Sequence, residues 1–556
     1  MPCKNIYSPS PDMFIMTRYI FVTGGVVSGL GKGVITASIG KILKSKGFSV
    51  TAIKIDPYLN YDAGTLRPTE HGEVWVTDDG GEIDQDLGHY ERFLDITLSR
   101  DHNITSGKIY YSVIEKERRG RYLGQTVQPI PHVTDEIKNW IYRVSKESGC
   151  DFTLVEIGGV VGDYENILFL EAARQMRMEN PGRVLFVHVA YVPILKSLGE
   201  MKTKPVQHSV KELRAIGIQP DFIVARCEGE LDDVRRAKIS LFTNVDQRDI
   251  FSAPDLEVVY ELPLIFEKMG FGDRILEKFG LRPIESDLSD WEKFVDTLKN
   301  SSKVVRVGIV GKYFRTGMYS LPDAYISVIE AVKHGAAYLG FKPQFEYINS
   351  VDIEEDPGLL GMLDNVDCII IPGGFGATGV EGKIMAINYA RENSIPILGL
   401  CYGFQLMVVE FARNVVGLEK AHTTEVDRKT PHPVITILPE QAKILSEDRY
   451  GGTMRLGSHK VILKRGSLAF EVYGREVIYE RFRHRYEVNP EYVDVLEEHG
   501  LLFTGMSEDG IKQLGELDRR LHPYFIGSQF HPEFTSRPLK PNPLFRALIA
   551  HGVGRR

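Results

Sequence analysis

The chain of 556 residues is 43% hydrophobic and 26% charged, and its formal net charge is −8 at pH 7. It is too long for one hydrophobic core, so two large domains or several small ones are expected. The negative net charge argues against a broad nucleic-acid-binding surface, so any phosphate binding should be local and confined to a pocket.

The sequence contains no apolar run of about 18 residues or more, so a membrane span is not expected. Residues 1–16 lack the apolar core of a signal peptide and, with three prolines, are expected to be a disordered tail. Five scattered cysteines show neither paired metal spacing nor a disulfide framework. A cytoplasmic location fits this pattern.

The first predicted element is a buried strand at 19–23, followed by the loop Gly-Gly-Val-Val-Ser-Gly-Leu-Gly-Lys-Gly at 24–33 and by a helix that ends near Gly47. Glycines allow backbone N–H groups to face an anion, the helix N-terminus adds partial positive charge, and Lys32 adds a full charge. The pattern therefore predicts a phosphate site; the alternative is a glycine-rich turn with a surface lysine.

This loop differs from the usual G-x-x-x-x-G-K-[ST] motif. Five residues separate Gly25 from Gly31, and Gly33 replaces the Ser or Thr whose hydroxyl would hold Mg²⁺. A metal ion at this site must therefore find its carboxylates elsewhere in the chain.

Candidates for these groups follow in chain order. A second strand at 48–55 places Lys54 at its end, although a solvated lysine is equally compatible with the spacing. The acidic segment 72–90 is by composition a solvated loop, but it also offers oxygen ligands for Mg²⁺. A buried strand at 151–157 carries Glu156 at its carboxyl end, where an unpaired charge is costly, so Glu156 is the better metal candidate.

Further strands at 184–189 and 222–225, with helices between, predict a mostly parallel, doubly wound sheet. The basic stretches 199–207 and 235–238 are either exposed charge or a site for a second polyanionic substrate. Residues from about 280 to 303 show no strand pattern and only a short helix around 291–298. A new strand starts at 304. We therefore expect a first domain at 17–281, a linker at 282–302 and a second domain at 303–556.

The second half contains a candidate nucleophile. The segment 395–405 places Cys401 in G-x-C-x-G spacing at a strand-to-helix turn, the cysteine counterpart of a nucleophile elbow. The helix N-terminus would lower the pKa of the thiol, and the backbone N–H of Tyr402 could face an oxyanion. The alternative is an inert buried cysteine.

A strand at 525–530 delivers His531 and Glu533, which we expect to act in series with Cys401. His531 would deprotonate the thiol and Glu533 would orient the imidazole. The alternative is a pair of surface polar residues.

Five segments together resemble the CTP synthase family: 24–33, Asp-Leu-Gly-His-Tyr-Glu-Arg-Phe at 86–93, Val-Glu-Ile-Gly-Gly at 155–159, 202–213, and Gln-Phe-His-Pro-Glu-Phe at 529–534. The resemblance extends from about Arg18 to the C-terminus. The triad is shared by all class I glutamine amidotransferases, whereas the first-half motifs are specific. The implied fold is α/β, with a P-loop-like amidoligase domain and a class I glutamine amidotransferase domain, both doubly wound.

The implied reaction is a ligation: ATP phosphorylates UTP at O4, ammonia from glutamine displaces the phosphate, and CTP results. By resemblance, Lys32 and Lys54 stabilise the transferring phosphoryl group, Asp86 and Glu156 hold Mg²⁺, and Cys401, His531 and Glu533 form the glutaminase triad. The residues implied to bind ATP are Gly29, Leu30, Gly31, Lys32, Gly33, Val34 and Asp86. Those implied for UTP or the feedback inhibitor CTP are Ser28, Asp163, Tyr164, Glu165, Lys202, Thr203, Lys204, Pro205, Val206, Gln207 and Lys238. Those implied for glutamine are Gly374, Tyr402, Gly403, Phe404, Gln405, Glu425 and Arg485.

The resemblance further implies a homotetramer and is compatible with filaments of tetramers. It is also compatible with GTP as an allosteric activator. It places His71 and Val74 near the gate of an ammonia passage. Tyr402 stands where leucine is common in the family. Two other interpretations stay open: another amidotransferase-coupled amide synthetase, and a nucleotide-sensing, filament-forming protein without catalysis.

Overall fold

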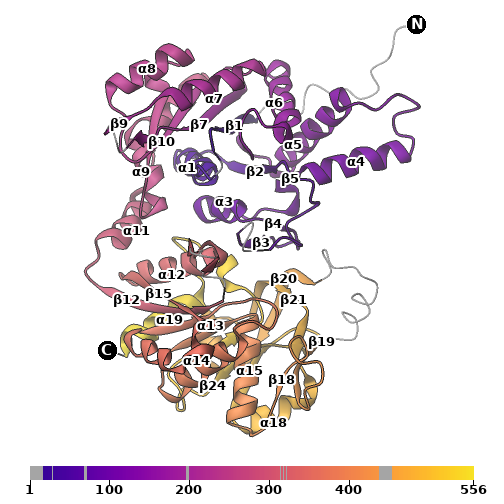
Figure 1. Cartoon of the computed structure of the whole chain (residues 1–556), viewed down its shortest axis with the longest axis vertical. Helices are drawn as coiled ribbons and strands as arrows, with labels where there is room; N and C mark the ends of the chain where they lie inside the picture. Colours follow the sequence, from indigo (N-terminus) through magenta and orange to yellow (C-terminus); the bar gives the residue numbers. More distant parts are fainter. Residues whose placement is uncertain are drawn as a thin grey trace. The chain divides into compact units, whose positions relative to one another are not determined.

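The computed structural model describes residues 17–27, 29–67, 72–195, 199–312, 315–316, 319–320, 322–437 and 454–555. The chain forms two compact units (Figure 1). The first unit comprises the described residues up to Asp62 together with His89–Leu288, and the second comprises Ala63–Gly88 together with the described residues from Ser289 onward.

The first unit is built on a seven-stranded sheet in the order β11-β10-β7-β1-β6-β2-β5, and every ladder in it is parallel. This arrangement confirms the predicted parallel, doubly wound sheet. The strands are β1 (Arg18–Gly25), β2 (Val50–Asp56), β5 (Asn103–Thr105), β6 (Phe152–Ile157), β7 (Val184–Tyr191), β10 (Phe222–Cys227) and β11 (Ile250–Pro254). A small antiparallel pair joins β8 (Ile194–Leu195) to β9 (Glu200–Met201).

Helices connect these strands, and α1 shows why they pack as they do. Its isoleucines at 35, 39 and 42 recur at helical spacing and are all buried. Gly47 follows the helix with φ +89°, the left-handed conformation predicted for its end. The helices are α1 (Lys32–Ser45), α3 (Asp86–Leu94), η2 (Arg100–His102), α4 (Ser106–Arg118), η3 (Pro129–Val133), α5 (Thr134–Ser148), η4 (Tyr164–Asn166), α6 (Ile167–Glu179), α7 (Lys204–Ala215), α8 (Asp233–Thr243), η5 (Gln247–Asp249), η6 (Val259–Glu261), α9 (Leu262–Lys268) and α10 (Phe271–Lys278).

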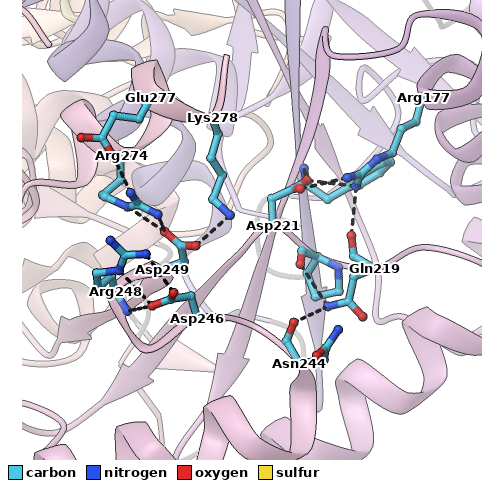
Figure 2. A network of polar contacts seen from close by, with 12 residues as sticks. Arg177, Gln219, Asp221, Asn244, Asp246, Arg248, Asp249, Arg274, Glu277 and Lys278 are labelled. Atoms are coloured by element: carbon cyan, nitrogen blue, oxygen red, sulfur yellow. Dashed lines mark hydrogen bonds and ion pairs between the residues drawn. The ribbon is translucent and has the colours of Figure 1, made fainter. Parts of the chain in front are cut away.

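Buried charges anchor α10 to the start of β11 (Figure 2). The carboxylate of Asp249, only 2% exposed, accepts hydrogen bonds from Arg274 at 2.8 and 2.9 Å and pairs with Lys278 at 2.7 Å. A second carboxylate, Asp221, accepts two hydrogen bonds from Arg177 in the same region. The buried Asp249 and the half-buried Asp221 are thus each paired with at least one cation.

The second unit contains a nine-stranded sheet in the order β15-β12-β16-β17-β25-β24-β23-β20-β21. The ladders from β15 to β25 are parallel, as predicted for a doubly wound domain. The remaining strands extend the sheet antiparallel, an addition that the sequence analysis did not foresee. The strands are β12 (Val304–Gly311), β15 (Lys342–Asn349), β16 (Cys368–Ile371), β17 (Ile397–Leu400), β20 (Arg455–Leu463), β21 (Val477–His484), β23 (Leu501–Met506), β24 (Lys512–Leu517) and β25 (Phe525–Ser528).

The remaining elements of the second unit surround this sheet or lie at its edges. The helix predicted around 291–298 is present as α11. The helices are α11 (Ser289–Asn300), η7 (Pro322–Tyr325), α12 (Ile326–Tyr338), α13 (Ser350–Glu355), η8 (Pro357–Asn365), α14 (Val380–Glu392), α15 (Tyr402–Asn414), α17 (Leu468–Tyr473), η9 (Pro490–Tyr492), α18 (Val493–Glu498), η10 (Pro532–Phe534) and α19 (Pro543–Gly554). The short strands are β3 (Val74–Val76), β4 (Glu82–Asp84), β13 (Arg315–Thr316), β14 (Tyr319–Ser320), β18 (His422–Thr423), β19 (Pro433–Ile437) and β22 (Tyr486–Val488).

The hairpin β3–β4 comes from the first half of the sequence but packs within the second unit. Asp78 at its turn pairs with Arg481 of β21 at 2.5 Å, and Glu82 pairs with Arg483 at 2.8 Å. Glu82 and Asp84 are buried. The interpretation of this acidic segment as a solvated loop is therefore wrong for these two residues, because arginines far away in the sequence neutralise part of its charge.

Candidate active site

Cys401 occupies a sharp turn between β17 and α15. Its backbone has φ +52° and ψ −102°, a conformation that is strained for a residue with a side chain. The flanking glycines are needed because a Cβ on Gly403 would lie 2.0 Å from the carbonyl oxygen of Ile371, and one on Gly399 would lie 2.3 Å from Sδ of Met407. The structure thus has the elbow that the G-x-C-x-G spacing predicts.

His531 and Glu533 lie beside this turn, after the end of β25. Nδ1 of His531 is 2.7 Å from Oε1 of Glu533, and both side chains are largely buried. Burial by itself lowers the pKa of His531, but the Glu533 carboxylate and the Cys401 sulfur outweigh burial and raise that pKa to about 10. The protonated imidazole can give its proton to a departing nitrogen.

The three residues share one pocket. Its wall is formed by Glu73, Val74, Ala324, Tyr325, Val328, Pro372, Gly373, Gly374, Phe375, Cys401, Arg483, His531, Glu533 and Phe534. Of the residues predicted to bind glutamine, Gly374 alone appears in this wall.

The other predicted glutamine residues are not part of this wall. Tyr402, Gly403, Phe404 and Gln405 belong to the first turn of α15 and are buried. Nε2 of Gln405 donates hydrogen bonds to the backbone carbonyl of Tyr486 at 2.8 Å and to Oε1 of Gln529 at 3.1 Å. Glu425 accepts a hydrogen bond from the Gly376 N–H at 2.6 Å, and burial raises its pKa. Arg485 lies between β21 and β22. These contacts support the wall and the loop that follows β16.

Sequence reasoning missed Glu73 and Arg483. Sγ of Cys401 lies 3.6 Å from the backbone carbonyl oxygen of Arg483, and the carboxylate of Glu73 accepts a hydrogen bond from the backbone N–H of Ser327 at 3.1 Å. More than 300 residues separate Glu73 from Cys401 in the chain, so no local pattern could have placed them together. Val74, which the resemblance implies to lie near the ammonia passage, is in this wall, whereas His71 lies outside the described residues.

The phosphate loop of the first unit also has the expected local form. Gly29 and Gly31 have φ of +73° and +75°, and α1 begins at Lys32. Nζ of Lys32 donates a hydrogen bond to the carbonyl oxygen of Gly159 at 2.8 Å, so it bridges the loops after β1 and β6. A Cβ on Gly24 would lie 2.7 Å from Cδ of Lys32, and this close approach requires glycine. Gly33 lies in the first turn of α1, and Ser28 is outside the described residues.

Lys54 and Glu156 lie directly opposite each other in the β2–β6 ladder. Their side chains pair at 3.1 Å and are both buried, so the interpretation of Lys54 as a solvated lysine is wrong. The hydroxyl of Tyr90 donates to the second carboxylate oxygen of Glu156. A lysine and an acid are thereby fixed at the carboxyl ends of neighbouring strands, where α/β proteins bind ligands.

Asp86 begins α3, and its N–H donates to Oδ1 of Asp84 at 2.8 Å. The described part of the chain contains no group of three or more His, Cys, Asp or Glu side chains arranged to hold a metal ion. Mg²⁺, however, commonly takes one or two carboxylates and completes its shell with water and phosphate oxygens. Asp86, in the second unit, and Glu156, in the first, each carry oxygen donors of this type.

A second pocket lies beside the phosphate loop. Among the predicted ATP residues, Leu30, Gly31 and Val34 form part of its wall, which also includes Ile35, Arg226, Ala253, Pro254, Leu256, Val259 and Leu262. Sequence reasoning missed Arg226. Its guanidinium donates to the carbonyl oxygens of Ala253 and Pro254 at 3.1 and 2.5 Å and pairs with Asp255 at 2.6 Å, so its flat face is fixed. A planar cation beside apolar side chains suits a nucleobase.

The predicted UTP and CTP residues are distributed over several elements of the first unit. Lys202 pairs with Glu200 at 2.7 Å, and Lys204 begins α7 with its Nζ 5.7 Å from the ring centroid of Phe242 on α8. Thr203 accepts a hydrogen bond from Gln207 at 3.1 Å. Pro205 and Val206 lie in the first turn of α7, Lys238 lies on α8, and Asp163, Tyr164 and Glu165 lie at η4, where Tyr164 is 95% exposed. Helices α7 and α8, which carry Lys204 and Lys238, pack together.

These two sites define the class of protein: a glutamine amidotransferase module joined to a nucleotide-binding module. Residues 18–281 match the family model for the CTP synthase N-terminus, and residues 320–551 match the model for class I glutamine amidotransferases. The chain is 56% identical over 540 residues to a CTP synthase of Sulfurisphaera tokodaii, covering 97% of this chain and 100% of that one. It is also 56% identical to the CTP synthases of Thermococcus kodakarensis and Pyrococcus furiosus, covering 96% of this chain and 98% and 97% of theirs. The chain therefore belongs to the CTP synthase family, the ligases of pyrimidine nucleotide synthesis that aminate UTP to CTP with glutamine as nitrogen donor (EC 6.3.4.2).

Proposed function

We propose that the amination of UTP is divided between two sets of residues. Cys401, His531 and Glu533 release ammonia from glutamine, and the phosphate loop with Lys32, Lys54 and Glu156 activates UTP with ATP. The observation that carries this division is that each set is fixed separately, one around a strained turn and the other across the β1, β2 and β6 strand ends. In this proposal the synthetase domain is 17–281 and the glutaminase domain 303–556, with the β3–β4 hairpin contributing to the second.

In the glutaminase step, the Cys401 thiolate attacks the carboxamide carbon of glutamine and forms a C–S bond. His531 protonates the departing nitrogen, the C–N bond breaks, and ammonia leaves. Water then attacks the thioester while His531 takes one of its protons, and glutamate and free Cys401 result. Glu533 holds the imidazole by its Nδ1 contact and stabilises its positive charge throughout.

In the synthetase step, O4 of UTP attacks the γ-phosphorus of ATP, and ADP leaves. Ammonia then attacks C4, and the phosphate departs with its bond to C4 broken. Lys32, held over the loop by Gly159, and Lys54, held by Glu156, would stabilise the charge of the transferring phosphoryl group. When bound at Asp86 and Glu156, Mg²⁺ would neutralise phosphate charge.

Isotope transfer tests this route. UTP carrying ¹⁸O at O4 should give inorganic phosphate that contains the ¹⁸O label when ATP, Mg²⁺ and ammonium chloride are present. Phosphate without the label would contradict phosphorylation of O4. A Lys32→Ala variant serves as a control, because it should form neither CTP nor labelled phosphate while it still hydrolyses glutamine.

We further propose that the chain assembles as a homotetramer. Tyr110, Tyr111 and Ile114 on α4 are exposed, as are Leu59 and Tyr61 near its start. Neighbouring exposed apolar residues of this size typically mark an interface. Sedimentation of the purified protein should show a tetramer, and Ile114→Lys with Tyr111→Lys should give smaller species; a monomeric wild-type protein would contradict the assembly.

Regulation and location complete the proposal. CTP would compete with UTP for the basic residues of α7 and α8, and Asp163–Glu165 would contact the bound CTP. GTP would act as an activator of the glutaminase. No described helix is long or apolar enough to cross a membrane. The cysteines at 150, 227, 368 and 401 are all free thiols, which supports a cytoplasmic location.

A further inference from the structure

A fully buried lysine lies behind the glutaminase pocket. Lys383 of α14 is 0% exposed, and its Nζ donates a hydrogen bond to the carbonyl oxygen of Pro372 at 2.9 Å. Nζ also lies 5.9 Å from the ring centroid of Tyr402. Burial, together with the nearby Lys312, lowers the pKa of Lys383 well below its ordinary value, whereas Cys401 opposes this shift. Burying a lysine is costly, so its contact with Pro372 calls for an explanation.

The carbonyl that Lys383 holds belongs to the peptide unit that joins Pro372 to Gly373. Gly373 lies in the pocket wall, and a Cβ on it would be 3.4 Å from Cε1 of His531 and 3.7 Å from Cβ of Cys401. This peptide is trans, so its C=O and N–H groups point in opposite directions. Because the carbonyl oxygen is directed toward Lys383, the Gly373 N–H is directed away from Lys383. Among the described residues, no backbone carbonyl accepts a hydrogen bond from this N–H.

We propose that Lys383 is a positioning residue for glutamine hydrolysis, which fixes the Pro372–Gly373 peptide so that the Gly373 N–H is aimed at the oxyanion. When Cys401 attacks, the C–S bond forms and the carbonyl π pair moves to oxygen. The Gly373 N–H, together with the Tyr402 N–H at the start of α15, would stabilise that oxygen. Lys383 itself touches neither substrate nor the reacting atoms. This inference rests on the proposed role of Cys401 as nucleophile.

The rest of the loop has its own supports. Lys312 donates to the carbonyl oxygens of Phe375 and Gly376, and the Tyr402 hydroxyl donates to Gly376 at 3.0 Å. Removing the Lys383 amine should therefore release one peptide plane and leave the following residues in place. The effect should fall on transition-state stabilisation more than on glutamine binding.

The test is Lys383→Met, which keeps an unbranched side chain that is one atom shorter and removes its donor. The glutaminase kcat should fall about tenfold to a hundredfold, which is less than the loss of about 10²–10³ for removal of an oxyanion donor, because the Gly373 N–H remains but is less well aimed. KM for glutamine should stay within about threefold. Ammonia-dependent CTP formation should be unchanged. Alkylation of Cys401 by iodoacetamide should keep its rate, because this displacement forms no oxyanion.

Arg391→Met is the matched control on the same helix. Arg391 pairs with Glu410 at 2.9 Å and is not in the pocket wall, so its loss should lower the melting temperature without lowering the glutaminase kcat. The proposal is overturned if Lys383→Met keeps the wild-type kcat, or if alkylation of Cys401 slows in parallel with kcat. Lys383→Gln retains uncharged hydrogen-bond donors, so its kcat should fall less than that of Lys383→Met. If both variants are as stable as the wild type and their kcat falls equally, the charge of Lys383 and not its hydrogen bond is responsible, and the proposal is contradicted. If Cys401→Ala still hydrolyses glutamine, the proposed function fails instead.

Discussion

The imidazole of His531 stacks on the ring of Phe534, with centroids 5.1 Å apart and planes at 15°. The far side of this contact is supported by Trp75 of β3, whose ring centroid lies 4.9 Å from that of Phe534. Arg481, which pairs with Asp78 at the hairpin turn, lies over Trp75 at 5.4 Å. A hairpin from the first half of the sequence thus supports the proposed base of the glutaminase.

Trp75→Leu should therefore lower glutaminase activity. Removing the ring leaves Phe534 and His531 less restrained, and small displacements of a proton-transferring group are costly. We expect kcat to fall about tenfold in a glutaminase assay, with ammonia-dependent CTP formation unchanged. Trp291→Leu is the control, because Trp291 is equally buried in α11 but packs on Phe294, whereas Trp75 packs on Phe534; if both variants lose kcat equally, the specific contact has no role.

The pH dependence follows from the raised pKa of His531. The folded protein binds the His531 proton more tightly than the unfolded chain, in which the pKa has its ordinary value of about 6.5. This proton therefore stabilises the folded protein, and its contribution is complete below about pH 6.5. It is lost as pH rises through about 10. The alkaline limb of the glutaminase profile should accordingly lie near pH 10. If activity instead falls near pH 7 because His531 loses its proton, Glu533 and Cys401 do not stabilise the imidazolium.

Asp249→Asn should destabilise the first unit. It leaves Arg274 and Lys278 without their shared carboxylate, and we expect a loss of about 1–3 kcal/mol in the free energy of unfolding, since both cations are partly exposed. Urea denaturation followed by fluorescence measures this change. Asp246→Asn nearby removes an exposed pair with Arg248 and should have no measurable effect; similar losses in the two variants would refute the importance of burial.

Glu156→Gln should abolish CTP formation from either nitrogen source. The substitution removes the closer of two buried carboxylates that pair with Lys54, at 3.1 Å against 3.8 Å for Asp56, and it removes a proposed Mg²⁺ ligand. Glutamine hydrolysis should persist, because Cys401 and its partners belong to the other unit. CTP formation at more than about a tenth of the wild-type rate would argue against a role of Glu156 in phosphoryl transfer.

Local patterns in the sequence were enough to predict several parts of the structure. The strand, glycine loop and helix around Lys32 were predictable because periodicity and glycine chemistry are local, and so was the elbow at Cys401. The buried position of Glu156 was predictable from its strand, but its partner Lys54 was not, because the ladder that joins them was unknown.

The remaining features depend on contacts between distant segments. Trp75 packs on Phe534 and lies under Arg481, and Glu82 pairs with Arg483. Arg226 meets the end of β11. None of these pairings leaves a periodic or spaced pattern in one segment. The antiparallel extension from β24 to β21 was likewise missed. All strands predicted for the second half belong to the parallel part of that sheet.

CTP formation from UTP, ATP and Mg²⁺, with glutamine or ammonium chloride as nitrogen source, is the most direct test of the account when wild type and Cys401→Ala are compared. The wild-type protein should make CTP from both sources, and Cys401→Ala should make it from ammonium chloride alone, because the thiolate serves glutamine hydrolysis and not UTP activation. Loss of both activities in a folded Cys401→Ala protein, or retention of both, would contradict the division of the reaction between the two sites.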